Sequence, residues 1–62
     1  MVKDLTAKIK AKVFERFGTI YIKIHEEEIK MNQVEDFLRE WRYGDLIEFF
    51  DGDKLIFVYS NH

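Results

Sequence analysis

The chain has no cysteine and no proline, and it contains only three glycines and one serine, Ser60. Without cysteine it can form neither disulfides nor thiolate metal sites. The glycines are isolated at positions 18, 44 and 52, so no glycine-rich phosphate loop exists. Nucleophilic catalysis also has little support, because the single serine lies near the C-terminus. From these absences we expect no enzyme activity, no catalytic residues, no cofactor and no metal.

Long apolar runs are missing as well. No stretch approaches the ~20 residues that a membrane-spanning helix needs. Lys8, Lys10 and Lys12 interrupt the N-terminal region where a signal peptide would have its apolar core. We therefore expect an intracellular, cytoplasmic protein with no membrane partner.

The 62 residues form one domain, residues 1–62, with an unusually apolar composition for this size: 47% of the residues are hydrophobic and 16% are aromatic. A chain this short buries only about 60% of its unfolded surface when it folds alone. The apolar residues therefore predict either a homodimer or a surface kept for another protein.

The formal net charge of -2 hides a division between the two parts of the chain. Residues 1–25 have six Lys or Arg against two acids, a balance of +4, whereas residues 26–62 have four against ten, a balance of -6. Salt screens charges beyond a Debye length of about 8 Å. The basic part can therefore attract phosphates although the whole chain is mildly acidic.

Two segments of the basic part alternate as strands do. Residues 6–16 and 19–25 each place aliphatic side chains at every second position, and Gly18 between them can adopt a positive φ. This pattern predicts a hairpin with one aliphatic face and one basic, aromatic face with few acids. The basic face would contain Lys8, Lys10, Lys12, Phe14, Tyr21, Lys23 and His25.

The middle of the chain changes period. Residues 32–43 have apolar side chains with helical spacing, at Val34, Phe37, Leu38 and Trp41. Asn32 with Glu35 predicts the helix start, and Gly44 predicts its end. Residues 26–31 are open between a strand, a loop and an early helical turn.

The last part predicts a second hairpin. Residues 46–50 and 54–59 are rich in β-branched and aromatic side chains, and Asp51-Gly52-Asp53 between them is a strong turn signal. The predicted class is therefore α+β, mostly β, in the order β-β-α-β-β. Because the second hairpin is apolar on both faces, we expect the helix to cover one face and a second copy of the chain to cover the other.

Two stretches resemble the AbrB/MazE-like (SpoVT-AbrB) swapped-hairpin family of transcription regulators and antitoxins. They are KVFERFGTIYIKI, with a turn glycine between two strands, and GDLIE followed by DGDKLIF. The family usually opens its helix with proline and an Arg-containing segment, where this chain has His25-Glu26-Glu27-Glu28. The resemblance implies an intertwined homodimer whose N-terminal strands face DNA.

The basic face and the resemblance together predict a small DNA-binding transcription regulator. It would be a cytoplasmic, nucleoid-associated homodimer on double-stranded DNA. Phe14 or Tyr21 could stack on a base, and Arg16 in the turn could read bases. The alternative for the lysines is a solvated face that protects an edge strand from aggregation. The DNA-binding residues would be Lys8, Lys10, Lys12, Arg16 and Lys23.

Other functions are also open. The chain could be a protein-interaction module, such as a small inhibitor or a viral accessory protein, with Trp41, Tyr43 and residues 26–28 at the interface. The side chains of His25, Glu26 and Glu28 could ligate a cation, but we expect a polar strand end and no metal. Only three residues follow Tyr59, so we expect a plain regulator rather than an antitoxin with a toxin-binding tail.

Overall fold

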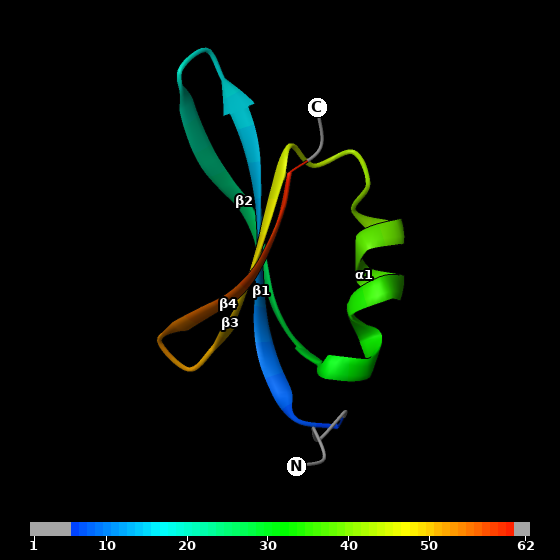
Figure 1. Ribbon diagram of the computed structural model, residues 1–62. Helices are drawn as coiled ribbons and strands as arrows, with labels where there is room; N and C mark the ends of the chain where they lie inside the picture. The colour runs from blue at the N-terminus through cyan, green and yellow to red at the C-terminus, as the bar shows by residue number, and fades with distance from the viewer. Residues whose placement is uncertain (1–5, 61–62) are drawn as a thin grey trace.

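The fold, known from a computed structural model that describes residues 6–60, is one antiparallel sheet with a single short α-helix (Figure 1). The predicted class and the order β-β-α-β-β are confirmed. The elements are β1 (Lys8–Phe17), β2 (Ile20–Lys30), a 3-10 turn (Met31–Gln33), α1 (Val34–Glu40), β3 (Leu46–Asp51) and β4 (Lys54–Ser60).

The strand order in the sheet is β2-β1-β3-β4, so β2 and β4 form its two edges. The two hairpins join inside one chain because β1 pairs with β3, from Lys10 opposite Phe50 to Phe14 opposite Leu46. The helix α1 lies along one face of this sheet (Figure 1). The end of the β1–β2 hairpin, residues 15–22, projects beyond the other strands, and the molecule measures 42 × 23 × 17 Å.

Both predicted turns form at glycines. Gly18 has a φ of 64° and Gly52 a φ of 65°. Each is the first residue of a two-residue loop, where a positive φ matches the twist of the flanking strands.

The segment left open in the sequence, residues 26–31, is mostly strand. β2 continues to Lys30, which lies opposite Lys8, and Met31 then begins the 3-10 turn. The Met31 N–H donates to the carbonyl of Ala7 at 2.9 Å. β1 and the residue before it, Ala7, thus provide the backbone partners of this segment, and this pairing determines its conformation.

The helix is shorter than predicted, and both of its predicted boundary signals are wrong. The Lys30 N–H donates to the Gln33 side-chain oxygen at 2.9 Å, and Asn32 does not cap the helix. The helix ends at Glu40, before Gly44. Gly44 is buried instead because the chain passes close to β1, where a Cβ would lie 2.7 Å from Cγ1 of Val13. None of the helical segments within residues 6–60 has the length and apolar character needed to cross a membrane.

The core lies between α1 and the sheet face beneath it, which we call the covered face. Alternate residues of β1 and β3 point into it, and Phe37 of α1 packs edge-on against Phe49 with ring centroids 5.9 Å apart. Met31, Val34, Leu38, Trp41 and Tyr59 are partly buried around this cluster. The buried residues are Ile9, Ala11, Val13, Ile29, Phe37, Ile47 and Phe49.

Candidate nucleic-acid interface

The predicted DNA-binding residues lie on the other face of the sheet, which we call the open face. Lys8, Lys10 and Lys12 alternate along β1 with the buried core residues, so they point away from α1. Residues directly opposite each other in an antiparallel pair share a face. Lys23 opposite Phe14 and Arg16 opposite Tyr21 therefore continue the same face toward the hairpin end.

The open face also holds carboxylates, so the expectation of few acids there is wrong. On one side of β1, Glu28 lies opposite Lys10 and Glu26 lies opposite Lys12. On the other side, Glu48 of β3 lies opposite Lys12. Alternation within a strand fixes which side chains share a face, whereas the register between strands decides which charges become neighbours.

Of these carboxylates, Glu26 forms ion pairs with two lysines. Its Oε1 lies 2.6 Å from Nζ of Lys23 and its Oε2 lies 3.5 Å from Nζ of Lys10. The hydrogen bond from Lys23, followed by the positive charges of Lys23 and Lys10, lowers the pKa of Glu26 below its ordinary value. The carboxylate is therefore ionised at neutral pH and offsets part of the lysine charge.

The balance on the open face stays positive. Lys30 lies opposite Lys8 and adds a sixth cation. Six cations minus three carboxylates leave a net charge of +3 on this face, while the chain has -2 in total. The cations are Lys8, Lys10, Lys12, Arg16, Lys23 and Lys30, and the carboxylates are Glu26, Glu28 and Glu48.

The aromatic neighbours of the lysines differ in access. Phe14 is half-buried, whereas Tyr21 is 43% exposed near the hairpin end. Nζ of Lys12 lies 4.6 Å from the ring centroid of Phe50, so a cation–π contact holds this ammonium over β3. Of the two predicted stacking residues, Tyr21 is the more accessible to a base.

Arg16 lies where β1 extends past the start of β3. Its Nε donates to the carbonyl of Gly18 at 2.9 Å, which holds the side chain at the turn. Its backbone N–H donates to Oδ2 of Asp45 at 2.7 Å, and the Asp45 N–H donates to the carbonyl of Phe14 at 3.0 Å. Asp45 thus extends the ladder beyond β3 and fixes the base of the projecting hairpin. In the sequence, Asp45 is distinguished only as part of the GDLIE stretch, because its partners in β1 are about 30 residues away.

His25 does not belong to the basic face, and that prediction is wrong. A register shift between Val13 and Phe14 places His25 opposite Val13, on the covered face. Its ring stacks on Trp41 with centroids 4.3 Å apart, and its Nε2 lies 2.9 Å from Oε1 of Glu27. No group of three His, Asp or Glu side chains in residues 6–60 is placed to hold a metal ion.

The two residues predicted for a protein interface occupy different environments. Trp41 packs on the edge of the core, and its Nε1 is buried without a hydrogen-bond partner in residues 6–60. Tyr43 is 81% exposed, with the guanidinium of Arg42 5.1 Å from its ring centroid. Of this pair, Tyr43 is therefore the residue whose ring is accessible.

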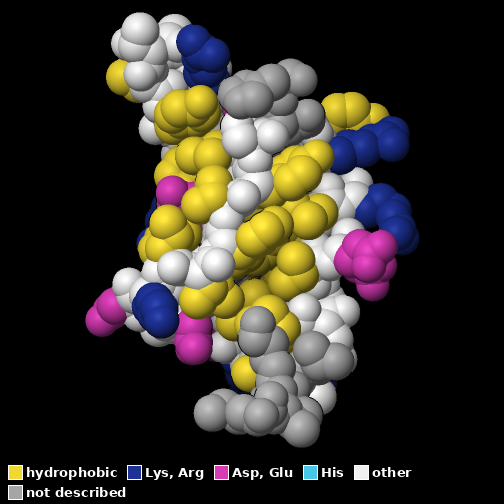
Figure 2. All heavy atoms as spheres, viewed as in Figure 1, with side chains coloured by type: hydrophobic (Ala, Val, Ile, Leu, Met, Phe, Trp, Pro, Cys, Tyr) yellow, Lys and Arg dark blue, Asp and Glu magenta, His cyan; other side chains and the backbone are white. Residues whose placement is uncertain are grey.

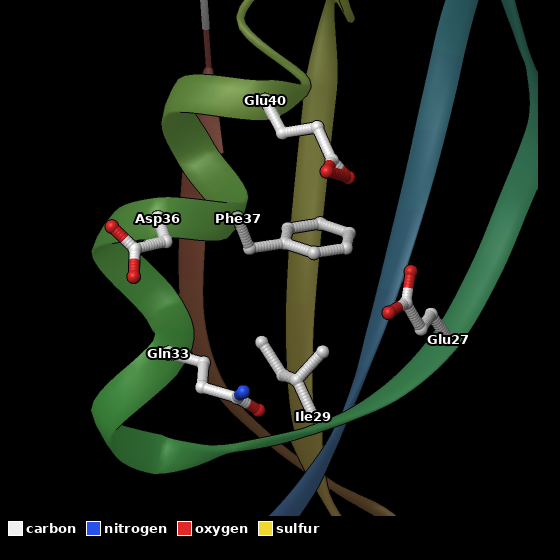
Figure 3. Close-up of a pocket in the computed structure, with 6 residues that line it drawn as sticks. All are labelled: Glu27, Ile29, Gln33, Asp36, Phe37 and Glu40. Carbon is white, nitrogen blue, oxygen red and sulfur yellow. The ribbon is translucent and has the colours of Figure 1, made fainter.

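A pocket, separate from the open face, lies beside the helix (Figure 3). It is a pocket of about 150 Å³ between α1 and β2. Glu40 and Glu27 extend toward each other across it, beside the ring of Phe37. Ile29 lies below that ring in the view, and Asp36 points outward. The lining residues are Glu27, Ile29, Gln33, Asp36, Phe37 and Glu40. The charge here is opposite to that of the open face.

Comparisons with protein-family models, with curated proteins and with solved structures found no match to this chain.

Proposed function

We propose that this protein is a small DNA-binding regulator whose open face contacts the phosphates of double-stranded DNA. The observation that supports the proposal is the concentration of six cations against three carboxylates on one sheet face of an acidic chain. Phosphate contacts provide most of the sequence-independent affinity for DNA. A face of net +3 suits weak contacts of this kind.

The carboxylates set the strength of this binding. Glu26 already engages Lys10 and Lys23, so these lysines must exchange one anionic partner for another when phosphate arrives. With about three effective phosphate contacts, log K should fall with log[salt] with a slope of about -3 for each protomer. Arg16 lies at the projecting hairpin, where a side chain can reach into a groove, and is the residue proposed to contact base edges.

Charge-matched variants test the proposal. Glu28→Gln removes a carboxylate from the open face, and Glu35→Gln removes one from α1, where its side chain is 89% exposed. Both variants change the net charge of the chain equally. We expect Glu28→Gln to tighten binding of a duplex several-fold and Glu35→Gln to leave it nearly unchanged, as measured by fluorescence anisotropy at about 50 mM salt.

Lys12→Gln completes the series on the open face. It should weaken binding of all duplex sequences to a similar degree and make the salt slope shallower by about 1. Arg16→Ala should instead reduce the preference between sequences. Equal effects of Glu28→Gln and Glu35→Gln, or no duplex binding by the parent chain at about 50 mM salt, would contradict the proposal.

The acidic pocket beside α1 favours a second candidate, a protein-interaction module. A lysine or arginine of a partner could lay its aliphatic stem on Phe37 and bring its charge between Glu27 and Glu40. This function would be supported by one stoichiometric protein partner that is lost with Glu40→Gln and kept with Glu35→Gln. The absence of duplex binding at about 50 mM salt would then separate it from the first candidate.

A further inference from the structure

The edge strand β4 exposes an uncharged apolar surface. Four consecutive side chains are 38–49% exposed: Leu55, Ile56, Phe57 and Val58. No charged residue lies between Lys54, which begins the strand, and Ser60, which ends it. As a sheet edge, β4 also presents unpaired backbone N–H and C=O groups, which can pair with another strand.

The opposite edge is protected along much of its length. From Lys23 onward, β2 contains Lys23 itself, residues 26–28 with three glutamates, and Lys30. Charged side chains on an edge strand oppose pairing with another chain. The longest uncharged run on β2 is therefore the three residues at its hairpin end, 20–22, whereas β4 has five between Lys54 and Ser60.

The apolar surface of β4 continues into a groove beside the helix. This groove has a volume of about 270 Å³ and includes Ile56 and Phe57 of β4. Figure 2 shows hydrophobic side chains gathered through the middle of this side of the molecule. The other lining residues are Ile9, Met31, Val34 and Phe49. Edge and groove together make one continuous apolar surface.

The accessible surface of the chain is larger than that of a compact monomer of the same mass. The accessible surface is 4860 Å² for a mass of 7.6 kDa, whereas a compact monomer of this mass exposes about 4300 Å². The surplus of about 600 Å² approaches the roughly 800 Å² that each partner buries in a standard interface.

We propose that β4 pairs antiparallel with β4 of a second copy of the chain and joins two sheets into one of eight strands. The regular part of β4 lies beyond its bulge, from Phe57 onward. With Val58 of each copy at the two-fold axis, Phe57 of one copy lies opposite Tyr59 of the other. Paired residues then share a face, and two aromatic cross-strand pairs form beside the grooves.

The charged residues of β4 also allow it to pair with a second copy of itself. In this register Lys54 lies beyond the paired segment, so no like charges face each other across the axis. The axis is perpendicular to the sheet, which places both helices on one side and both open faces on the other. The two β1 strands would lie five strand spacings apart, about 24 Å. The dimer does not depend on DNA binding, but it would double the cationic surface.

Two matched lysine variants test the interface by sedimentation equilibrium of the full chain. Val58→Lys and Ile22→Lys each replace a β-branched side chain, 43% and 45% exposed respectively, on opposite edges of the sheet. We expect a dimer for the parent chain and for Ile22→Lys, and at least a tenfold increase in the dimer dissociation constant for Val58→Lys. A monomeric parent chain at about 100 μM, or a dimer lost only with Ile22→Lys, would overturn the proposal.

A cysteine variant tests the register of the pairing. Unlike the lysine variants, it is read out by a covalent bond between the two copies and not by a loss of dimer. Opposed residues at the axis have Cα atoms about 4.5–5.5 Å apart, within the disulfide range. Because the chain has no cysteine, Val58→Cys should form a covalent dimer with copper phenanthroline and oxygen as the oxidant. Ile22→Cys should form little under the same conditions. Equal cross-linking of both variants would overturn the proposed register.

Discussion

The two faces of the sheet come from the same four strands but are completed in different ways. On the covered face, Phe37 of α1 closes a cluster that includes Phe49 and Ile47, both fully buried. On the open face, β1 and β2 present lysines and glutamates. β3 and β4 present apolar residues such as Phe50 and Val58, together with Glu48. No element of residues 6–60 covers that face.

This difference shows how a 62-residue chain divides its apolar residues. One helix of seven residues is enough to close one face and no more. The covered face should therefore control the free energy of unfolding, and the open face and its apolar edge should control binding. Variants that separate these two roles test the comparison directly.

Phe49→Ala should have the largest effect. This fully buried ring contacts Phe37 and Phe57, and its loss should reduce the free energy of unfolding by about 3–5 kcal/mol. A domain of this length has only about 3–9 kcal/mol in total, so the variant should be largely unfolded by circular dichroism. Tyr43→Ala, which removes an 81% exposed ring, should change stability by less than about 0.5 kcal/mol. Similar losses in the two variants would contradict the assigned core.

Gly44→Ala should have the next largest effect, because the new Cβ would lie 2.7 Å from Cγ1 of Val13. We expect a loss of about 1–3 kcal/mol in chemical denaturation. In a double-mutant cycle, Val13→Ala should offset part of the loss, since it removes the clashing methyl group. Strictly additive losses would show that the glycine is required for another reason.

His25→Ala should have a smaller effect, confined to the rim of the covered face. Its ring stacks on Trp41 at 4.3 Å, and such ring pairs contribute about 0.5–1.5 kcal/mol. The tryptophan fluorescence should shift to the red as water reaches the indole. His25→Phe keeps an aromatic ring and should keep both the stability and the emission maximum. An unchanged emission in His25→Ala would count against the stack.

The ion pairs of Glu26, on the open face, should have the smallest effect on stability. Its pKa is lowered in the folded chain, first by the hydrogen bond from Lys23 and then by the charges of Lys23 and Lys10. A lowered folded-state pKa stabilises the fold above the unfolded pKa, and this contribution is lost as pH falls through the folded value. An NMR titration should find the Glu26 pKa below 4.5. Lys23→Met should raise it, and a Glu26 pKa that does not respond would contradict the ion pair.

Much of the fold could be predicted from local patterns. Alternation identified β1 and the first part of β2, and β-branched and aromatic content identified β3 and β4. Gly18 and Gly52 marked both turns because a two-residue hairpin loop favours a positive φ. The predicted apolar stripe is also confirmed, since Phe37 is buried and Val34, Leu38 and Trp41 pack against the core. The pattern could not give the extent of β2, because residues 26–30 have no clear period of their own and become strand by pairing with β1.

The candidate site was less predictable. A bulge in β2 moved His25 to the covered face, and single-residue shifts of this kind leave no reliable mark in one sequence. The same limit applies to Glu26 and Glu48. They are distant from the β1 lysines in sequence and become their neighbours through register alone.

By itself the sequence determined the class of elements, their order, the glycine turns and the alternation that places the β1 lysines on one face. These features follow from interactions within a few residues of each other, which a sequence displays directly. Only the tertiary structure decided which acids lie beside those lysines and why Gly44 must lack a side chain. It also decided which strands form the edges of the sheet. Each of these depends on contacts between strands far apart in the chain, and those contacts are fixed by packing.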